Sequence, residues 1–437
     1  MNRRGARALG SPRDLRVPQS GRCAPCWRLR ATSLGRKLPA LGRSALCASA
    51  VLIFFSGALV RADERKTLSR TEDLVVLTGA ELPKLRGIHK DLLRAYASRA
   101  GKLEPIPFQV DERTPELEYC WTSGPDPVKD VDDGRVDEDD EVAFRAADAG
   151  DRTTEGSIAG STARMEIELE DPLDGGKGWV YVFAYEDKGH APPARSERRL
   201  VEVLPDPAGG AVFRTTSFEV ASTGSAGLTG RPRGIRFRKG DASRPAAVSD
   251  AAHLKLHASY LLGRIDREGS DARTTLGTSF IDGPVRALAP ISLEVYLIWG
   301  NWISSSRSYV SVHDHTYEVH ARFLVPVNLD TDHASEARLS VALADGTAWK
   351  TKALGSGTLG LIGPPGALAV TLELDPRLKS RPLNGGELGV DLTGLHKSDE
   401  ARPYEVTYVL HALPEGTEED LRALIRYRDK PLRHAAR

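Results

Sequence analysis

The feature that most constrains this fold is a pair of strand-like segments around a glycine-containing turn. Residues 165–170 (MEIELE) alternate apolar and acidic side chains, which is the period of a half-buried β-strand. Residues 174–176 (DGG) can turn the chain, and residues 179–185 (WVYVFAY) follow as a second strand rich in aromatic residues. The sequence therefore predicts a β-hairpin whose aromatic side chains share one face. A packed core explains that face more simply than a sugar-stacking platform.

Strand-like segments separated by Gly, Pro and Asp turns continue along most of the chain. Residues 92–98 and 102–110 suggest another hairpin, and 308–328 is a long strand-like run. Only residues 418–427 look helical, with Thr417 as the N-cap and acidic residues in the first turn. Strands without long intervening helices favour antiparallel sandwiches. We therefore expect an all-β fold of two antiparallel β-sandwich domains with a short C-terminal helix.

Three regions are expected along the chain. Residues 1–62 have the pattern of an export signal: a basic region, an apolar run at 45–60, and Val60 and Ala62 placed for cleavage after Ala62. The apolar run is short for a membrane-spanning helix, although an uncleaved anchor is the alternative. A polar segment at 187–199 separates a smaller sandwich domain, 63–190, from a larger one, 200–437. We expect an exported protein, periplasmic, cell-surface or extracellular, with no membrane span in the mature chain.

The charge balance limits the kinds of partner that the chain can bind, and the cysteine content limits its metal and disulfide chemistry. Without residues 1–62 the chain keeps 48 basic and 59 acidic side chains, a net charge of −11. That balance argues against nucleic acid as a partner and favours cations or neutral ligands. Cys23, Cys26 and Cys47 fall in the leader, so the CxxC there does not indicate zinc or redox chemistry. Cys120 alone remains and cannot form an internal disulfide.

An acidic stretch suggests a cation site. Nine carboxylates occupy the sixteen residues from Asp126 to Glu141, around one glycine. Such like charges repel unless a cation or solvent compensates them, and Asp-rich loops around a glycine commonly bind Ca²⁺. With Gly134 at the glycine position of an EF-hand-type loop, half of the ligand positions match. We predict a calcium site; a solvated acidic loop is the alternative. Its ligands would be Asp130, Asp132, Asp133, Asp137, Asp140 and Glu141.

The segments that flank this stretch carry a family resemblance. They are IPFQVDE at 106–112, the acidic stretch followed by a short apolar strand at 141–144, and DAGDR at 148–152. With GWVYVFAY at 178–185 and IDGPVR at 281–286, they resemble an uncharacterised family of secreted bacterial all-β proteins over roughly residues 70–330. The resemblance implies no established activity and no catalytic residues.

The IDGPVR segment also shows a looser similarity. Its Gly-Pro-Val-Arg part is similar to a strand of galactose-mutarotase-like β-sandwiches, which include some polysaccharide lyases. This similarity implies a carbohydrate-active enzyme, a lyase or a hydrolase. The simpler interpretation is an edge strand that starts at Gly283-Pro284, with Arg286 as an exposed charge. An enzyme would need acid and base groups, and the chemically suitable side chains are Asp111, Glu112, His315 and Tyr317.

A histidine-rich segment offers a third possibility. Residues 311–320 read SVHDHTYEVH. On one strand, His313 and His315 would point to the same face. A His-x-His pair with a third ligand from elsewhere could hold a transition metal. A solvated polar sheet face is the alternative.

Three hypotheses for function follow from the sequence. The first is a non-catalytic binding or structural protein with a calcium-stabilised loop and a carbohydrate or another cell-envelope component as partner. The second is the carbohydrate-active enzyme, and the third is a transition-metal protein. A cleft lined by Arg286, His313 or His315, an aromatic residue and a carboxylate would favour the enzyme. Scattering of these side chains would argue against it.

Overall fold

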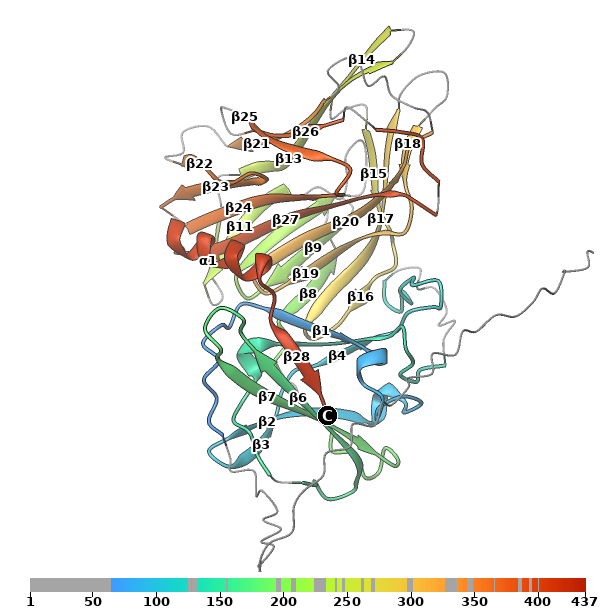
Figure 1. Cartoon of the computed structure of the whole chain (residues 1–437), viewed down its shortest axis with the longest axis vertical. Helices are drawn as coiled ribbons and strands as arrows, with labels where there is room; N and C mark the ends of the chain where they lie inside the picture. Colours follow the sequence, from blue (N-terminus) through green and yellow to red (C-terminus); the bar gives the residue numbers. More distant parts are fainter. Residues whose placement is uncertain are drawn as a thin grey trace, which may run out of the picture. The chain divides into compact units, whose positions relative to one another are not determined.

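Antiparallel β-strands form most of the described chain (Figure 1). The computed structural model describes residues 64–437 with gaps, and the predicted leader lies outside the described residues. The gaps are 125–126, 128–132, 155, 194–197, 206–209, 224–232, 240–241, 246–247, 261–262, 269–271, 297–301, 327–335, 344–348, 365, 384–386, 393–394 and 400. The prediction of an all-β fold with one short C-terminal helix is confirmed.

Two sheets form the first sandwich. The smaller sheet has the order β1 (Leu74–Thr78), β5 (Glu141–Arg145), β4 (Gln109–Asp111). The larger sheet has the order β28 (Arg433–Ala436), β6 (Ser161–Glu170), β7 (Lys177–Tyr185), β2 (Leu93–Arg99), β3 (Lys102–Pro105). Single-turn 3-10 helices lie at Gly79–Glu81, Lys90–Leu92 and Ala146–Asp148. Buried apolar side chains from both sheets, such as Leu77 and Val182, pack into one core.

The hairpin predicted from residues 165–185 is present as β6 and β7. The aromatic side chains of β7 pack with Tyr96 into a buried cluster, so they belong to packing and do not form an exposed platform. The other predicted hairpin is present only in part. Residues 102–110 do not form one strand, because the chain leaves β3 at Pro105 and starts β4 at Gln109 in the opposite sheet.

Two ten-stranded sheets form the second sandwich. One runs β25 (Lys379–Leu383), β26 (Glu387–Asp391), β21 (Glu336–Leu343), β13 (Val248–Tyr260), β11 (Arg233–Lys239), β10 (Phe218–Thr223), β9 (Gly210–Thr215), β8 (Val201–Pro205), with β12 (Ala242–Pro245) on β11 and β14 (Gly263–Glu268) on β13. The other runs β15 (Ala272–Leu276), β17 (Arg286–Tyr296), β18 (Trp302–Ser305), β20 (Thr316–Leu324), β27 (Tyr404–Pro414), β24 (Gly366–Leu374), β23 (Thr358–Gly363), β22 (Lys350–Gly355). In this second sheet β16 (Ile281–Asp282) pairs with β17, and β19 (Ser308–His313) pairs with β17 and β20. Buried residues of both sheets, including Phe213 and Tyr317, form the shared core.

The C-terminal helix α1 (Glu418–Asp429) begins where the sequence predicted. Thr417 accepts a hydrogen bond from the Asp420 backbone N–H, and the Asp420 carboxylate accepts one from the Thr417 backbone N–H. These two bonds form a capping box at the start of the helix. Leu421 and Leu424 of the helix pack on the second sandwich. Within the described part of the chain, no helix has the length and apolar content needed to cross a bilayer.

After α1 the chain returns to the first sandwich. Residues 433–436 form β28, which pairs with β6, whereas the sequence-based division had placed them in the second domain. Arg70, just before β1, donates hydrogen bonds to the carbonyls of Tyr427 and Lys430 at the end of α1, over 2.5 and 2.6 Å. The described residues between 64 and 437 accordingly belong to one compact unit.

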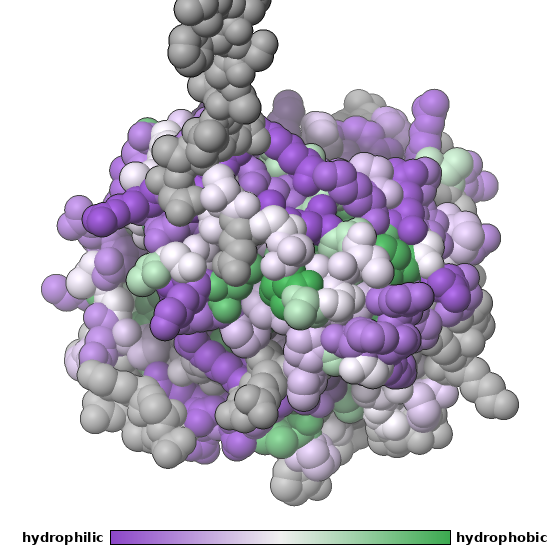
Figure 2. Space-filling view, turned by 90° about the horizontal axis from the view of Figure 1, so that it is seen from below, coloured by the Kyte–Doolittle hydropathy of each residue, from purple (hydrophilic) through white to green (hydrophobic). Residues whose placement is uncertain are grey.

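The surface in Figure 2 is mostly hydrophilic, with small separate apolar patches. Among the described residues, Leu117 and Leu173 are the exposed large hydrophobic side chains. Isolated apolar side chains are ordinary on a protein surface. Neither the face in Figure 2 nor the exposed side chains of the described residues offer an argument for a docking site.

Candidate functional site

One face of the second sandwich carries aligned polar side chains. Across β17, β19, β20 and β27 the register places Arg286 opposite His313, His313 opposite Thr316, and Thr316 opposite His411. Because side chains alternate along a strand, the same face also carries the residues two and four positions away. These are Ser311 and Tyr309 on β19, and Glu318 and His320 on β20. The opposite face, with Ala287, Val312 and Leu410, enters the core.

The His-x-His prediction is wrong in its geometry. Residues 311–320 form a hairpin, with β19 ending at His313 and β20 starting at Thr316. His315 therefore lies in the turn, where its Nε2 is 2.7 Å from an oxygen of Glu72. Burial opposes protonation of His315, but Glu72 and Asp314 outweigh it and raise its pKa. Among the described residues, no three His, Cys, Asp or Glu side chains are grouped to hold a metal ion.

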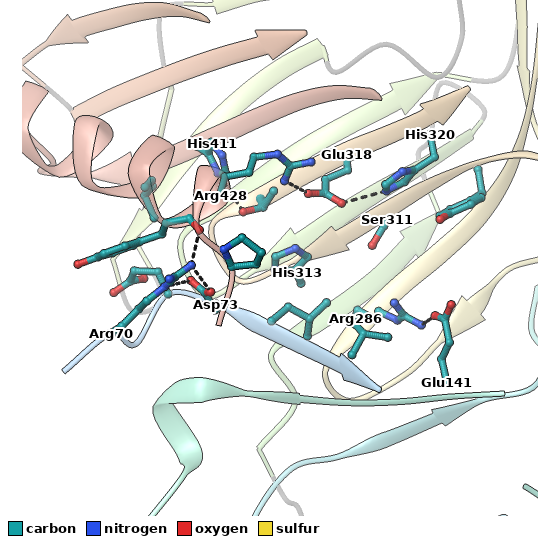
Figure 3. Close-up of a pocket in the computed structure, with 18 of the residues that line it drawn as sticks. Arg70, Asp73, Glu141, Arg286, Ser311, His313, Glu318, His320, His411 and Arg428 are labelled. Carbon is teal, nitrogen blue, oxygen red and sulfur yellow. Dashed lines mark hydrogen bonds and ion pairs between the residues drawn. The ribbon is translucent and has the colours of Figure 1, made fainter. Parts of the chain in front are cut away.

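The polar face forms the floor of a cavity of about 370 Å³ (Figure 3). Residues of the first sandwich cover it: Arg70, Glu72, Asp73, Leu74 and Val76 around β1, and Tyr119 and Glu141. The end of α1 and the residues after it, including Arg428, contribute the remaining wall. This volume lies at the small end of the range for ligand sites, ~300–1,000 Å³. The polar sheet face, for which the sequence favoured a fully solvated position, is thus the floor of a partly covered cavity between the two sandwiches.

Arg286 stands at one end of the cavity. It is only 5% exposed, so its interpretation as a surface charge is wrong. Its Nη2 lies 2.7 Å from Asp111 on β4 and 2.5 Å from Glu141 on β5, which joins the two sandwiches. Glu141 also accepts from Tyr119 and pairs with Arg113. Burial opposes ionisation of Glu141, but the two guanidinium groups outweigh it and lower its pKa.

Gly283 of the IDGPVR segment makes room for this arrangement. The side-chain oxygen of Gln109 accepts hydrogen bonds from the backbone N–H groups of Val285 and Arg286, and its Nε2 donates to Asp111. A β-carbon at position 283 would lie 1.9 Å from that Gln109 oxygen. The segment is therefore shaped by a buried amide that aligns Arg286.

Replacing Gly283 with alanine should destabilise the fold by about 1–3 kcal/mol, because Gln109 would lose its buried partners. Urea unfolding measures the change, with Gly175→Ser as a control at a turn glycine that has open space around it. The control position has a positive φ and should lose up to ~1 kcal/mol from backbone strain alone. A loss at position 283 no larger than that of the control would contradict the role assigned to Gln109.

Glu318 and Arg428 stand at the other end of the cavity. Arg428 reaches Glu318 over 2.5 Å and Glu373 over 2.9 Å. The second oxygen of Glu318 lies 3.0 Å from Nε2 of His320. Burial opposes ionisation, but His320 and Arg428 outweigh it and hold the pKa of Glu318 well below its usual range. The carboxylate is therefore ionised and already bound at both oxygens.

His313 and His411 differ from the charged groups of the cavity. Burial lowers the pKa of His313 to about 4 and that of His411 to about 3. Both imidazoles are neutral at pH 7. Nδ1 of His411 lies 3.1 Å from the Thr316 hydroxyl, but its Nε2 is buried without a hydrogen-bond partner among the described residues. A buried polar atom without a partner costs about 1–3 kcal/mol, so this nitrogen is available to a water molecule or a ligand in the cavity.

These two histidines should make the fold sensitive to acid. Their folded-state pKa values lie below the ordinary 6.5, so the unfolded chain binds more protons below that pH. Stability should fall as the pH drops from 6.5 towards 4 and 3, by roughly 1 kcal/mol per pH unit for each histidine. Urea unfolding at pH 7 and 5.5 should differ by roughly 2 kcal/mol. His313→Gln should reduce that difference and His190→Gln, at an exposed position, should not; equal slopes in both variants would contradict the assignment.

The predicted calcium ligands separate into four groups. Asp130 and Asp132 lie outside the described residues. Asp133 and Asp137 each accept a hydrogen bond from a backbone N–H two residues ahead. Asp140 is buried and accepts from the backbone of Arg113 and Asp137. Glu141 belongs to the cavity, 2.5 Å from Arg286. Calcium binding in the acidic stretch stays a prediction.

The four side chains chosen from the sequence as acid or base do not line the cavity. Asp111 pairs with Arg286, Glu112 pairs with Lys90, His315 pairs with Glu72, and Tyr317 is in the core. The cavity residues that the sequence reasoning missed include Tyr309, Ser311, Glu318 and His320. In the sequence, polar residues recur at every second position on both sides of Asp314-His315, and this pattern could have identified them.

Comparison with models of protein families finds no match, and neither does comparison with curated protein sequences. The chemistry of the cavity is therefore the basis for assigning a function.

Proposed function

We propose that the protein is an exported carbohydrate-active enzyme in which His313 and His411 transfer protons. The observation that carries this proposal is the pair of neutral imidazoles in an otherwise ion-paired cavity. Arg286, His313, aromatic residues and carboxylates line one cavity, which is the arrangement that favours an enzyme over a scattered polar surface. Export rests on the leader-like pattern of residues 1–62.

Neutral imidazoles suit proton transfer at physiological pH. A general base must be unprotonated and within hydrogen-bond reach of the proton that it removes. His411 Nε2 is buried and lacks a partner among the described residues, so a ligand hydroxyl or a water molecule in the cavity can bond to it. Tyr119 and Tyr309 contact each other in an edge-on arrangement, with ring centroids 5.0 Å apart, and give the cavity an aromatic wall. Aromatic surface beside hydrogen-bonding groups matches the two kinds of surface on a sugar.

The carboxylates of the cavity argue against the usual glycosidase mechanism. That mechanism needs one protonated carboxylic acid and one free carboxylate. Glu141 and Glu318 both have lowered pKa values, and each is bound by two or more donors. They are suited to orienting Arg286, Arg428 and His320. The proton transfers therefore fall to the histidines.

Product analysis on a panel of neutral and acidic glycans tests the proposal. The purified protein should release new reducing ends from at least one glycan. Ultraviolet absorbance of an unsaturated sugar would identify elimination, and its absence would identify hydrolysis. A folded protein that produces neither from any glycan at neutral pH would refute the enzyme assignment.

The second candidate function is non-catalytic sugar binding. The observation in its favour is that both Glu141 and Glu318 are already saturated by protein donors. Under this alternative a glycan binds and is recovered unchanged. The same panel distinguishes the two functions when binding is measured beside product formation.

A further inference from the structure

Each charged side chain that lines the cavity has an ionisable partner, either in the lining or directly beside it. These side chains are the cations Arg70, Arg286 and Arg428 and the anions Glu72, Asp73, Glu141 and Glu318. Arg70 is 2.5 Å from Asp73, and Glu72 is 2.7 Å from His315. Arg286 and Arg428 each contact two carboxylates. No cation of this lining is left without an anion.

The groups left to meet a ligand are uncharged. They include the hydroxyl of Ser311, the imidazole of His313, and Nε2 of His411. Ser311 is 4% exposed and lies on the same strand face as His313, directly beside Glu318 in the register. These groups exchange hydrogen bonds with hydroxyls without any change in charge. They carry no positive charge, so they cannot offset the cost of burying a ligand carboxylate.

A negatively charged ligand would meet an electrostatic cost here. Its carboxylate would add a fifth anion to a lining with three arginines, beside groups that are themselves buried, such as Arg286 and Ser311. Burying a charge without a free partner is strongly unfavourable. A neutral sugar replaces water at the same donors and acceptors and incurs no such cost.

From this pairing we infer that the cavity binds an uncharged sugar unit and discriminates against its uronate counterpart. The inference rests on the proposed function and narrows its substrate to neutral glycans. Elimination requires the carboxylate of a uronate beside the reacting carbon, so a neutral substrate leaves hydrolysis. In that reaction one product takes the hydroxyl of a water molecule and the other takes its remaining proton.

Calorimetric titration with matched sugars tests the inference. The probes are glucose with glucuronate and galactose with galacturonate, at one ionic strength and with the full-length protein. Each neutral sugar should bind at least about ten-fold more tightly than its uronate. Equal or tighter binding of both uronates would overturn the inference, even if turnover supports the enzyme assignment. If none of the four sugars binds, the inference fails; if no glycan is cleaved either, the proposed function fails as well.

A second test removes a negative charge just outside the cavity and leaves every lining residue unchanged. Glu373 is 43% exposed and holds Arg428 from outside the cavity. Glu373→Gln leaves Arg428 with Glu318 as its carboxylate partner and should raise uronate affinity relative to the neutral sugar by roughly three- to ten-fold. Glu405→Gln is the matched control, because Glu405 is 67% exposed and pairs with Arg322, which does not line the cavity. No change in the ratio for Glu373→Gln, or an equal change in the control, would contradict the charge-balance explanation.

Discussion

Replacing His313 with alanine should reduce the turnover of a responsive glycan by about 10²–10⁴-fold while the fold persists. The imidazole lies in the cavity between Arg286 on β17 and Thr316 on β20, and its pKa of about 4 keeps it unprotonated at pH 7. Alanine removes the base but adds no charge. Steady-state kinetics at pH 7 measures the loss, and circular dichroism with urea unfolding checks the fold.

The control separates catalysis from structure. His190 is exposed and pairs with a nearby side chain, Asp187, so His190→Ala should retain full activity. Added imidazole should restore part of the activity of His313→Ala, because a small base can enter the space left by the ring. A merely structural histidine would not be rescued in this way. Full activity in both His313→Ala and His411→Ala would exclude the proton-transfer mechanism.

The dependence of the reaction on pH gives a second signature. With a free-enzyme pKa of about 4, the base stays active well below the ordinary histidine range. The acid limb of kcat/KM should therefore have its midpoint below pH 5.5. Because the fold also weakens in acid, the measurement belongs in the range where unfolding curves show an intact protein.

The strands could be predicted because their signals are local. Residues 165–170 alternate within one segment, and the turn at 174–176 fixes the return strand, so β6 and β7 follow from a short window. The cap at Thr417 is also local, and α1 begins where the cap predicts. The break between β3 and β4 was missed because it depends on which sheet each half joins.

The site was harder to predict because it depends on contacts between distant residues. Arg286 forms ion pairs with Asp111 and Glu141, which lie far away in the sequence. No periodic pattern in the sequence predicts such a pairing. The polar face of β19 was visible as alternation, but an exposed face and a covered face have the same pattern. Only the first sandwich and the end of α1 distinguish them, since they cover part of that face.

The cluster around Arg286 should also dominate the stability of the two-sandwich unit. Replacing Arg286 with methionine should cost about 3–5 kcal/mol, because Asp111 and Glu141 would remain buried without their shared cation. Arg307→Met is the matched control: Arg307 is 38% exposed and pairs with Glu118, so its loss should cost at most about 1 kcal/mol. Urea unfolding of both variants measures the difference.

A second substitution tests whether the cost comes from uncompensated charge. Burial raises the pKa of Asp111 despite the opposing charge of Arg286, so this carboxylate depends most on its partner. Adding Asp111→Asn to Arg286→Met should recover about 1–2 kcal/mol, since the amide is neutral and can still accept from Gln109. If the double variant is no more stable than the single one, the loss comes from packing. Recovery would mean that one ion cluster both joins the two sandwiches and forms the end of the cavity, so that binding and stability depend on the same three charges.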